Sequence, residues 1–529
     1  MLHGHSILNG CSTPGSGPVF SAFNPAVGAP LEPLFHSASV ADVDRAAQLA
    51  EQAFVVYSRV SGRDKADFLR RIAENIEISA PELIDRAHRE SGLTEKRLQV
   101  ETVRTANQLR MFAQLVEEGS WVNACIDLAQ PDRTPLPRPD VRSVLRPLGP
   151  VAVFGASNLP LAFSVAGGDT ASALAAGNPV IVKAHPAHPG TSELAGQIVA
   201  RSASQCGLPA GVFALLFDAG TEIGAALVQQ PLVKSVAFTG SLSAGKALMD
   251  LAATRPEPIP CYMEMSSTNP FIVLPEALDT RAAQIGKDLY ASFTLNVGQF
   301  CTKPGLVFLP HDHSADVLIA VLAAQVEAAD TSVMLTEGIC RNYSSTLTAR
   351  TGHNGVEVIA RSNASNESGG ASITPTLLQT DGTDLLNAPE LAKEVFGPAT
   401  LIVRYTDREE LLALARALEG QLTATLHASE AELAAHADLV AILERKAGRL
   451  IVNGYPTGVE VCHAMVHGGP YPATSDSRTT SVGTLAIHRF ARPVCYQNFP
   501  QSALPDELKN PNPLGIWRTV DGTLTRDPL

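Results

Sequence analysis

One of the eight cysteines in this 529-residue chain stands in a setting that favours nucleophilic chemistry. Cys301 follows Asn296-Val-Gly-Gln-Phe and precedes Thr-Lys-Pro-Gly305, so we expect it on a loop bounded by glycine and proline, outside any apolar helix face. A thiol on a loop beside a helix is placed where its pKa is lowered and a thiolate is available to attack an electrophilic carbon. A buried structural cysteine is the alternative for any single residue of this type.

A single carboxylate interrupts the strand-like run from Ile259 to Met265, which carries no other charge. Burial of that group, Glu264, costs several kcal/mol unless a partner or a proton compensates its charge. A functional carboxylate that moves a proton is therefore one interpretation of the residue. An edge-strand residue that faces water is the other.

Two polar side chains follow neighbouring predicted strands at the point where each strand ends. Asn158 comes just after the predicted strand at 151–154, and Lys183 ends the strand at 180–182. Open α/β sheets bind ligands at this carboxyl edge, so we expect both side chains to face one site. Taken singly, Asn158 could cap a helix and Lys183 could extend along the surface to water.

A glycine-containing element, Phe238-Thr-Gly-Ser-Leu-Ser-Ala-Gly245, stands where another predicted strand gives way to a helix. Backbone N–H groups at a helix N-terminus suit a pyrophosphate, and Gly240 allows close approach because it has no Cβ. The spacing is not G-x-G-x-x-G, and an ordinary tight turn between strand and helix would use the same residues.

The elements that position these residues belong to a chain of globular composition. Apolar residues make up 45% and charged residues 18%, and 529 residues are too many for one core, so two or three domains are expected. The net charge of −13 disfavours nucleic acid and membrane surfaces as partners. The scattered cysteines predict neither a disulfide framework nor a metal site, and the start of the chain, without an apolar leader, predicts a cytoplasmic location.

Strands and helices alternate along most of the chain. Between Arg146 and Lys183 the only charged side chain is Asp169, but prolines and glycines interrupt the stretch, so buried strands around a helix at 163–176 are favoured over a membrane span. Three further strand–helix pairs reach residue 253, and a second alternation, which includes a predicted helix at 430–443, follows Ile259. Two doubly wound parallel sheets are therefore predicted.

Other segments fall outside this alternation. The first hundred residues are predicted to be helical, with helices at 41–54, 65–78 and 81–91. The Pro- and Arg-rich stretch 131–147 breaks helices and indicates an excursion from the main body. The Gly-, Pro- and Thr-rich stretch 455–483 is predicted to be a long ordered loop or a lid, and the tail from Gln497 shows too little apolar periodicity for a core of its own.

Taken together, these motifs resemble those of the aldehyde dehydrogenase superfamily, in its order, over about residues 20–490. They are Ser157-Asn-Leu-Pro-Leu161, Lys183 after Val-Ile-Val, Phe-Thr-Gly-Ser-x-x-x-Gly at 238–245, Glu264, Phe293-x-x-Asn-x-Gly-Gln-x-Cys301 and Glu394-Val-Phe-Gly-Pro398. The resemblance implies an α/β fold of the aldehyde dehydrogenase type, with two doubly wound parallel-sheet domains and a small β oligomerisation element. It implies an NAD(P)-binding domain at 1–125 and 146–263, a catalytic domain at 264–465, and an oligomerisation element with the C-terminal tail at 126–145 and 484–529. A homodimer or homotetramer is then expected.

The same resemblance implies roles for the site residues. Cys301 thiolate would attack an aldehyde, the Asn158 amide would hold the oxyanion of the thiohemiacetal, and Glu264, with a pKa nearer neutrality than that of an exposed carboxylate, would activate the water that hydrolyses the thioester. Family members that prefer NAD often carry Glu three residues after the lysine. Pro186 stands there, so both cofactors are expected and NADP is predicted to be preferred over NAD. The residues implied to contact the cofactor are Ser157, Lys183, Gly240, Ser241, Gly245, Glu394 and Phe396.

Further motifs resemble the branch of this family that oxidises 2-oxoglutarate semialdehyde (2,5-dioxopentanoate). They are Glu264-Met-Ser-Ser-Thr-Asn-Pro270, His467-Gly-Gly-Pro-Tyr-Pro-Ala-Thr474, Tyr496-Gln-Asn-Phe-Pro500 and Asn512-Pro-Leu-Gly-Ile-Trp-Arg518. Two departures stand in the cofactor region, where the usual Glu-x-Gly-Gly ends in two serines and Ser157 replaces a common Trp. The distal 2-oxo-carboxylate of such a substrate needs cations or amide donors. Candidates are Gln299, Lys303, Tyr455 and His463.

Three alternatives remain open from the sequence. The same fold could oxidise an aliphatic aldehyde with NADP, in a pocket that lacks a cation. A CoA-acylating enzyme would replace hydrolysis by thiolysis, which Glu264 disfavours because no water then needs activation. A non-catalytic oligomer that binds NADP without turnover is the alternative of a different class.

Overall fold

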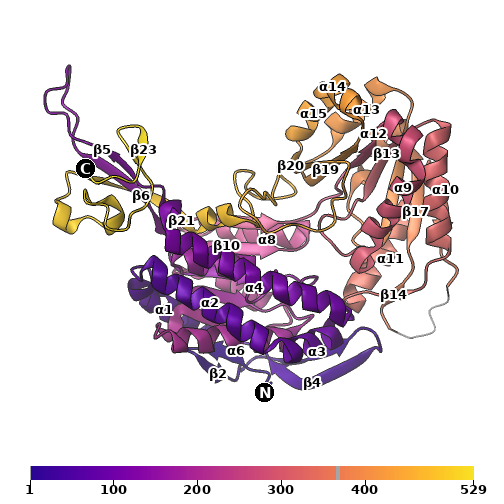
Figure 1. Ribbon diagram of the computed structural model, residues 1–529. Coiled ribbons are helices and arrows are strands. Elements are labelled where there is room, and N and C mark those ends of the chain that lie inside the picture. The colour runs from indigo at the N-terminus through magenta and orange to yellow at the C-terminus, as the bar shows by residue number, and fades with distance from the viewer. Residues whose placement is uncertain (1, 365–369) are drawn as a thin grey trace.

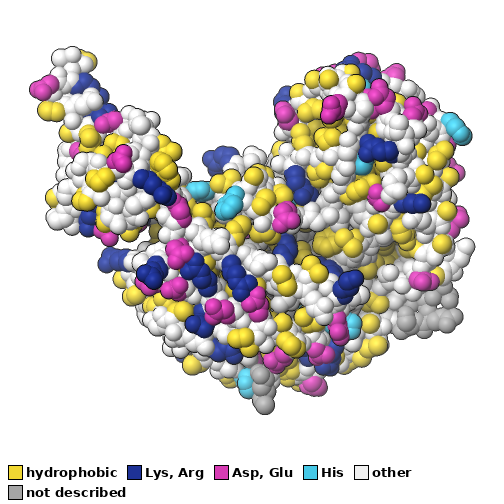
Figure 2. Space-filling view, in the orientation of Figure 1, with side chains coloured by type: hydrophobic (Ala, Val, Ile, Leu, Met, Phe, Trp, Pro, Cys, Tyr) yellow, Lys and Arg dark blue, Asp and Glu magenta, His cyan; other side chains and the backbone are white. Residues whose placement is uncertain are grey.

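The computed structural model describes residues 2–364 and 370–529, and three larger sheets organise this part of the chain (Figure 1). Two of them form α/β layers, one from residues up to Glu264 and one from Phe271 onward, and the third forms a small arm that projects from the first layer. Figure 2 shows the surface hollowed between this arm and the lobe of the second layer. The predicted fold class is therefore confirmed.

The first sheet has the strand order β11-β10-β7-β8-β9-β1-β2, with β7 to β11 parallel and the two N-terminal strands antiparallel at one edge. Alternate residues enter two apolar clusters: Val151 and Val153 face one, Ala152 and Phe154 the other. Burial on both faces explains why these strands carry so few charges. The elements of this layer are β1 (Ser6–Leu8), β2 (Cys11–Thr13), α1 (Val40–Tyr57), α2 (Gly62–Ile78), α3 (Ala80–Ser91), α4 (Glu95–Glu118), β7 (Val151–Phe154), α5 (Gly168–Ala176), β8 (Val180–Lys183), α6 (Pro189–Gln205), β9 (Phe213–Leu216), α7 (Glu222–Gln229), β10 (Ser235–Thr239), α8 (Leu242–Ala253) and β11 (Cys261–Glu264).

The second sheet has the order β15-β17-β18-β13-β12-β19-β20 and is parallel except for β15 at one edge. Its central strands are again buried along their whole length, with helices on both sides (Figure 1). The elements are β12 (Phe271–Val273), α9 (Pro275–Thr294), β13 (Leu306–Pro310), α10 (His313–Glu327), α11 (Glu337–Thr351), β15 (Glu357–Arg361), β17 (Thr376–Asp381), α12 (Gly382–Asn387), β18 (Ala399–Tyr405), α13 (Arg408–Ala417), β19 (Gln421–His427), α14 (Glu430–Ala435), α15 (Ala437–Glu444) and β20 (Ala447–Val452).

The third sheet brings the excursion near residue 140 together with the C-terminal tail. Its order is β21 (Ala491–Gln497), β6 (Val141–Pro147), β5 (Cys125–Asp127), β22 (Arg518–Val520) and β23 (Thr523–Thr525). The tail supplies Leu504, Leu508 and Ile516 to a small apolar cluster that it shares with β5 and β6. Two short pairs complete the strands: β3 (Val19–Asn24) with β4 (Ala29–His36), and β14 (Ser332–Val333) with β16 (Ser372–Ile373).

Most of the predicted alternation is found, with three corrections. Residues 6–36 contain strands β1 to β4, so the helical prediction for the first hundred residues is wrong there. Helix α5 begins at Gly168 and not at residue 163, because Leu161 and Ala162 donate their backbone N–H groups to Glu101 in a loop. The helix predicted at 430–443 is interrupted at His436, between α14 and α15. The domain boundaries stay a prediction.

Among the residues that the structure describes, no helix combines the length and the apolar character needed to cross a bilayer.

Candidate active site

Cys301 lies on a tight loop after α9, as the flanking glycines predict. The chain reverses through Asn296, Val297 and Gly298, which all have positive φ, and Cys301 is half-buried beyond this turn. A Cβ on Gly298 would stand 2.3 Å from the carbonyl oxygen of Gly397, so glycine is required for the loop to pack there. This packing brings the Cys301 loop against the segment that holds Glu394 and Phe396.

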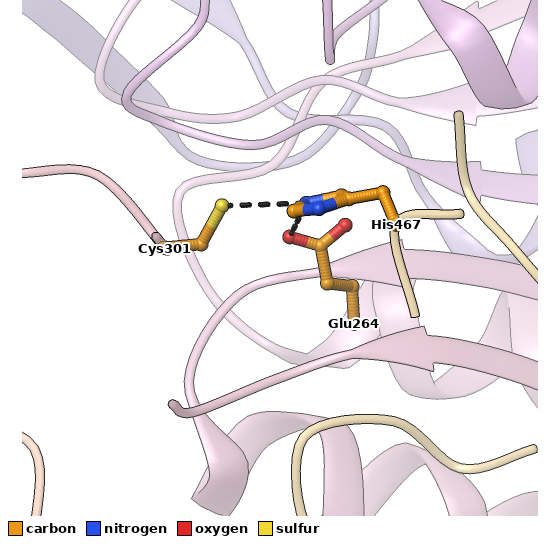
Figure 3. Close-up of side chains that lie close together, drawn as sticks. All are labelled: Glu264, Cys301 and His467. Atoms are coloured by element: carbon orange, nitrogen blue, oxygen red, sulfur yellow. Dashed lines mark hydrogen bonds and ion pairs between the residues drawn. The ribbon is translucent and has the colours of Figure 1, made fainter. Parts of the chain in front are cut away.

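Three side chains with acid–base or nucleophilic chemistry converge in the structure (Figure 3). The Nε2 atom of His467 lies 3.5 Å from the Sγ of Cys301 and 2.8 Å from Oε1 of Glu264. Ser481 donates a hydrogen bond of 2.8 Å from its hydroxyl to the other oxygen of Glu264. Glu264 and His467 are both buried, so the carboxylate is held by two partners away from bulk water.

His467 reaches this position because the long segment after β20 folds over the end of β11. The Met265 N–H donates to Ala473 O at 2.8 Å, and the Ser475 N–H donates to Met263 O at 3.1 Å. The Ser481 N–H in turn donates to His467 O at 2.8 Å. The segment predicted as an ordered loop or lid is thus ordered by backbone hydrogen bonds to the strand that carries Glu264.

The pKa shifts correct two expectations. Burial raises the pKa of the Cys301 thiol well above its ordinary value, the negative charge of Glu264 raises it further, and Arg104 opposes this only in part. Burial also favours a raised pKa for Glu264, but the charge and hydrogen bond of His467 and the hydroxyl of Ser481 overcome it and lower that pKa. The sequence expectations of a lowered cysteine pKa and a glutamate pKa nearer neutrality are both wrong for this state.

Asn158 lies beside the nucleophile loop. Its side-chain Nδ2 donates to the backbone oxygen of Gln299 at 3.0 Å, two residues before Cys301. The loop that carries Asn158 is held by α4: Glu101 accepts from the N–H groups of Leu161 and Ala162 at 2.9 and 3.0 Å. A rigid amide donor therefore lies next to the loop of the thiol, as an oxyanion-binding group would have to.

Ser157, Lys183 and Gly240 follow or end strands at the carboxyl edge of the first sheet, where the strand order reverses between β7 and β10. Ser241 caps α8 by accepting from the Ala244 N–H, and Gly240 and Ser241 are exposed, so the N-terminus of this helix is open to an anion. Gly245 is buried, and a Cβ there would lie 2.7 Å from the sulfur of Met265. The donor set fits a pyrophosphate at the start of α8.

Four other residues are implied to contact the cofactor. Lys183 is buried at the end of β8, donates from Nζ to Asp218 O at 2.8 Å, and has its pKa lowered to about 8 by burial. Ser266 donates to Oε2 of Glu394 at 2.6 Å, and burial raises the pKa of that carboxyl group. Ser157 and Phe396 are half-buried. The serine that departs from the usual glycine thus orients Glu394.

The four candidates for substrate binding are not brought together. Lys303 is buried and its Nζ donates to the carbonyl oxygens of Val395 and Ala399, each at 2.7 Å. Gln299 is fully buried, and its Oε1 accepts a hydrogen bond of 3.0 Å from the Leu335 N–H. Since their polar atoms are occupied inside the protein, neither faces a substrate.

Among the described residues, the remaining two candidates form no hydrogen bond with Cys301, Glu264 or His467. Tyr455 donates to Asp288 at 3.3 Å and stacks on Phe271, and His463 is exposed. Sequence reasoning does not identify His467 as a site residue. The motif His-Gly-Gly-Pro at 467–470 carries only a resemblance to a branch of the family. Nothing in the local pattern shows that this loop returns to β11.

The convergent side chains also form a set of metal-ligating types that the sequence did not predict. The ligand atoms of Glu264, Cys301 and His467 lie within 4.8 Å of one another. Thiolate, imidazole and carboxylate are common zinc ligands. A divalent metal held there would occupy the nucleophile, so the cluster is more consistent with sensitivity to added metal than with metal-dependent catalysis.

The chain is similar to known proteins over most of its length. The chain matches the model of the aldehyde dehydrogenase family over residues 13–471. It is 50% identical to alpha-ketoglutaric semialdehyde dehydrogenase 2 of Azospirillum brasilense, over 98% of this chain and 99% of that protein. It is 46% identical to alpha-ketoglutaric semialdehyde dehydrogenase of Acinetobacter baylyi, over 99% of each.

Solved structures agree at the level of the fold. Aldehyde dehydrogenase C of Pseudomonas syringae, in a complex with NAD+ and octanal, superposes with a TM-score of 0.79 at 23% identity, over 94% of this chain and 98% of the other. The NADP-dependent glyceraldehyde-3-phosphate dehydrogenase of Bacillus halodurans, complexed with NADP, gives 0.79 at 22% identity, over 94% and 99%. With the match of the family model and the two full-length relatives, these findings show that the chain belongs to the aldehyde dehydrogenase family.

Proposed function

We propose that this protein oxidises 2-oxoglutarate semialdehyde (2,5-dioxopentanoate) to 2-oxoglutarate with NADP or NAD. The observation that carries the proposal is the convergence of Cys301 and Glu264, with Asn158 beside the nucleophile loop, in a chain of the aldehyde dehydrogenase family. The choice of aldehyde is supported by the names of two relatives that match over nearly the whole chain.

Cys301 attacks the carbonyl carbon of the aldehyde and forms a thiohemiacetal. Because the resting thiol has a raised pKa, its proton must leave as the carbon–sulfur bond forms, and the proton acceptor is Glu264, whose carboxylate lies within 4.8 Å of the sulfur. Asn158 donates a hydrogen bond to the oxyanion that develops on the substrate oxygen. A preorganised donor of this kind contributes about 3 kcal/mol to transition-state stabilisation.

Glu264 acts a second time, when water cleaves the thioester. The carboxylate takes a proton from the water while oxygen attacks the acyl carbon, and the carbon–sulfur bond breaks to return Cys301. A lowered pKa keeps Glu264 ionised and ready for this step across the neutral range. His467 and Ser481 fix the orientation of the carboxylate and are positioning residues.

The cofactor is proposed to bind along the carboxyl edge of the first sheet. A bound nicotinamide dinucleotide supplies the acceptor for the hydride that leaves the substrate carbon. Its pyrophosphate would meet Gly240, Ser241 and Gly245, while Glu394 and Lys183 would each contact a ribose. Ser157 and Phe396 would border the nicotinamide. NADP is proposed to be preferred, because Pro186 offers no negative charge against a 2′-phosphate.

A homodimer or homotetramer is proposed, joined through the arm, where β21 is an edge strand of the third sheet and its backbone is available for pairing. A cytoplasmic location stays a prediction, which cell fractionation would test.

The decisive experiment is a substrate panel with both cofactors on the wild type, Cys301→Ser and Glu264→Gln. We expect turnover of 2-oxoglutarate semialdehyde to exceed that of hexanal, with higher catalytic efficiency for NADP than for NAD. Cys301→Ser should abolish turnover, and Glu264→Gln should accumulate a covalent acyl-enzyme visible by mass spectrometry. Preference for hexanal would favour an aliphatic aldehyde dehydrogenase, and NADP binding without turnover of any aldehyde would favour a non-catalytic oligomer.

A further inference from the structure

Among the residues that the structure describes, two arginines near Cys301 make hydrogen bonds only to backbone carbonyl oxygens. Arg104 of α4 donates to Val459 O at 3.3 Å, and Arg449 of β20 donates to Gly458 O at 3.1 Å and to Pro456 O at 2.6 Å. Both side chains are half-buried, and neither forms an ion pair with a carboxylate anywhere in residues 2–364 or 370–529. Because Gly458 and Val459 are consecutive, the two guanidinium groups border the same short turn.

A chain of contacts leads from this turn to the nucleophile. The guanidinium carbon of Arg104 lies 5.2 Å from the ring centre of Phe163, and that ring lies 6.3 Å, centre to centre, from the ring of His467. His467 in turn contacts Sγ of Cys301 at 3.5 Å. The aromatic face of Phe163 stabilises the cation above it and limits where Arg104 can point.

Electrostatic coupling links both arginines to the same thiol. Burial lowers the pKa of Arg104 and of Arg449, and the negative charge that Cys301 carries as a thiolate opposes this shift in each. In return, Arg104 lowers the pKa of Cys301 against the effect of burial. Both guanidinium groups are therefore within the electrostatic reach of the reacting sulfur.

Half-buried cations without an ion-paired carboxylate are costly, and an anion bound between them would relieve that cost. We propose that Arg104 and Arg449 bind the distal carboxylate of the aldehyde substrate. Guanidinium groups match a carboxylate with parallel N–H donors. The four carbon–carbon bonds between the aldehyde carbon and the carboxylate carbon of a five-carbon oxo acid span roughly 5 Å when extended. This assignment rests on the proposed function.

Other cations near the site are already neutralised or occupied. Arg97 is ion-paired with Glu101 and donates to Asn158 O. Lys303, one of the four candidates from the sequence, donates from its ammonium group to two carbonyl oxygens. Arg104 and Arg449 differ from Arg97 because neither forms an ion pair among the described residues. They differ from Lys303 because both are half-buried and each guanidinium has more N–H donors than the backbone carbonyls use.

The test compares charged and neutral aldehydes of equal length. Arg104→Gln and Arg449→Gln would be assayed with 2-oxoglutarate semialdehyde, with succinic semialdehyde, and with the neutral aldehydes pentanal and butanal. We expect kcat/KM for the charged aldehydes to fall by about 30-fold or more in each variant, mainly through KM, because a charge-assisted contact is lost. Turnover of the neutral aldehydes should change by less than about threefold, and Arg104→Lys should restore part of the preference.

Arg110→Gln is the matched control, since Arg110 lies on the same helix but pairs with Glu77 at the surface. If the wild type prefers charged aldehydes and the arginine variants keep that preference, the assignment of these arginines is wrong while the proposed function stands. If the wild type prefers succinic semialdehyde to 2-oxoglutarate semialdehyde, and the variants lose the preference for charged over neutral aldehydes, the arginine site stands and the named substrate is wrong. No preference for charged aldehydes in the wild type overturns both, and an equal loss for charged and neutral aldehydes shows that the arginines are structural.

Discussion

A single imidazole nitrogen joins the nucleophile to the base in this protein. Nε2 of His467 contacts both Sγ of Cys301 and Oε1 of Glu264, while its Nδ1 is buried without a hydrogen-bond partner among the described residues. Because burial alone would raise the pKa of Glu264, the ionised state of that carboxylate depends on His467 first and on Ser481 second. The acid limb of the pH profile should therefore report on His467.

We predict that His467→Ala moves the acid limb of kcat for deacylation to higher pH by at least about one unit. In the wild type the lowered pKa keeps Glu264 ionised, so activity is retained as the pH falls until that low pKa is reached. Without His467, burial dominates and the carboxylate is protonated at higher pH. Pre-steady-state hydrolysis of the acyl-enzyme between pH 4 and 9 measures the limb, with Ser481→Ala as a control that removes the weaker partner.

The wild-type carboxylate also contributes stability that is present at neutral pH and lost as the pH falls through its lowered pKa. An acid limb that stays in place in His467→Ala would show that another group keeps Glu264 ionised.

Site residues at the ends of regular strands can be predicted from the sequence, whereas those on irregular segments cannot. Strand β7 was predicted with its observed bounds because four buried, uncharged residues between glycines and prolines leave little alternative. Asn158 and Lys183 are predicted at one edge because parallel strands end together. His467 could not be placed, since the segment after β20 has no helical or strand periodicity and its position depends on backbone hydrogen bonds to Met263 and Met265.

Electrostatic environments were harder to predict than positions. The sequence shows that Cys301 follows a glycine turn, but not that the thiol is buried beside Glu264. Burial first, and the charge of Glu264 second, reverse the expected direction of the thiol pKa. Lys303 was a reasonable candidate for the substrate carboxylate from its position alone, and only the fold shows that its ammonium group is enclosed.

Helix α4 holds the loop after β7 through one buried carboxylate. Glu101 accepts from the N–H groups of Leu161 and Ala162 and is ion-paired with Arg97, which donates to Asn158 O. We predict that Glu101→Ala lowers the free energy of unfolding by about 3 kcal/mol, because two buried N–H groups and a guanidinium lose their partner. Urea unfolding measures this change.

The same variant should lower kcat more than it raises KM, because the Asn158 amide loses its fixed position. Glu117→Gln, on the same helix but in an exposed pair with Arg70, should leave both properties close to wild type. Loss of stability with unchanged kcat would show that the loop keeps its geometry without the Glu101 carboxylate.

At the scale of the whole molecule, an acidic protein is proposed to bind two anionic ligands with local groups. The net charge is −13, yet the cofactor region offers the N-terminus of α8 and the substrate region offers Arg104 and Arg449. Helices α4 and α8 belong to the first layer and β20 to the second, whereas β5, β6 and β23 of the arm project away from both layers (Figure 1). The arm can therefore be perturbed without removing a residue of the proposed active site.

The arm has a small core that one substitution should disrupt. Ile516 is 1% exposed within the cluster shared by β5, β6 and the tail, whereas Leu514, two residues earlier, is 51% exposed. We predict that Ile516→Asp dissociates the proposed oligomer, because a buried unpaired carboxylate costs at least about 3 kcal/mol and the sheet that carries β21 then loosens.

Leu514→Asp is the matched control and should keep the wild-type mass by light scattering. NADPH binding should persist in both variants, since α8 and β10 are not touched. An Ile516→Asp protein that keeps both its fold and its assembled mass would place the subunit contact outside the arm.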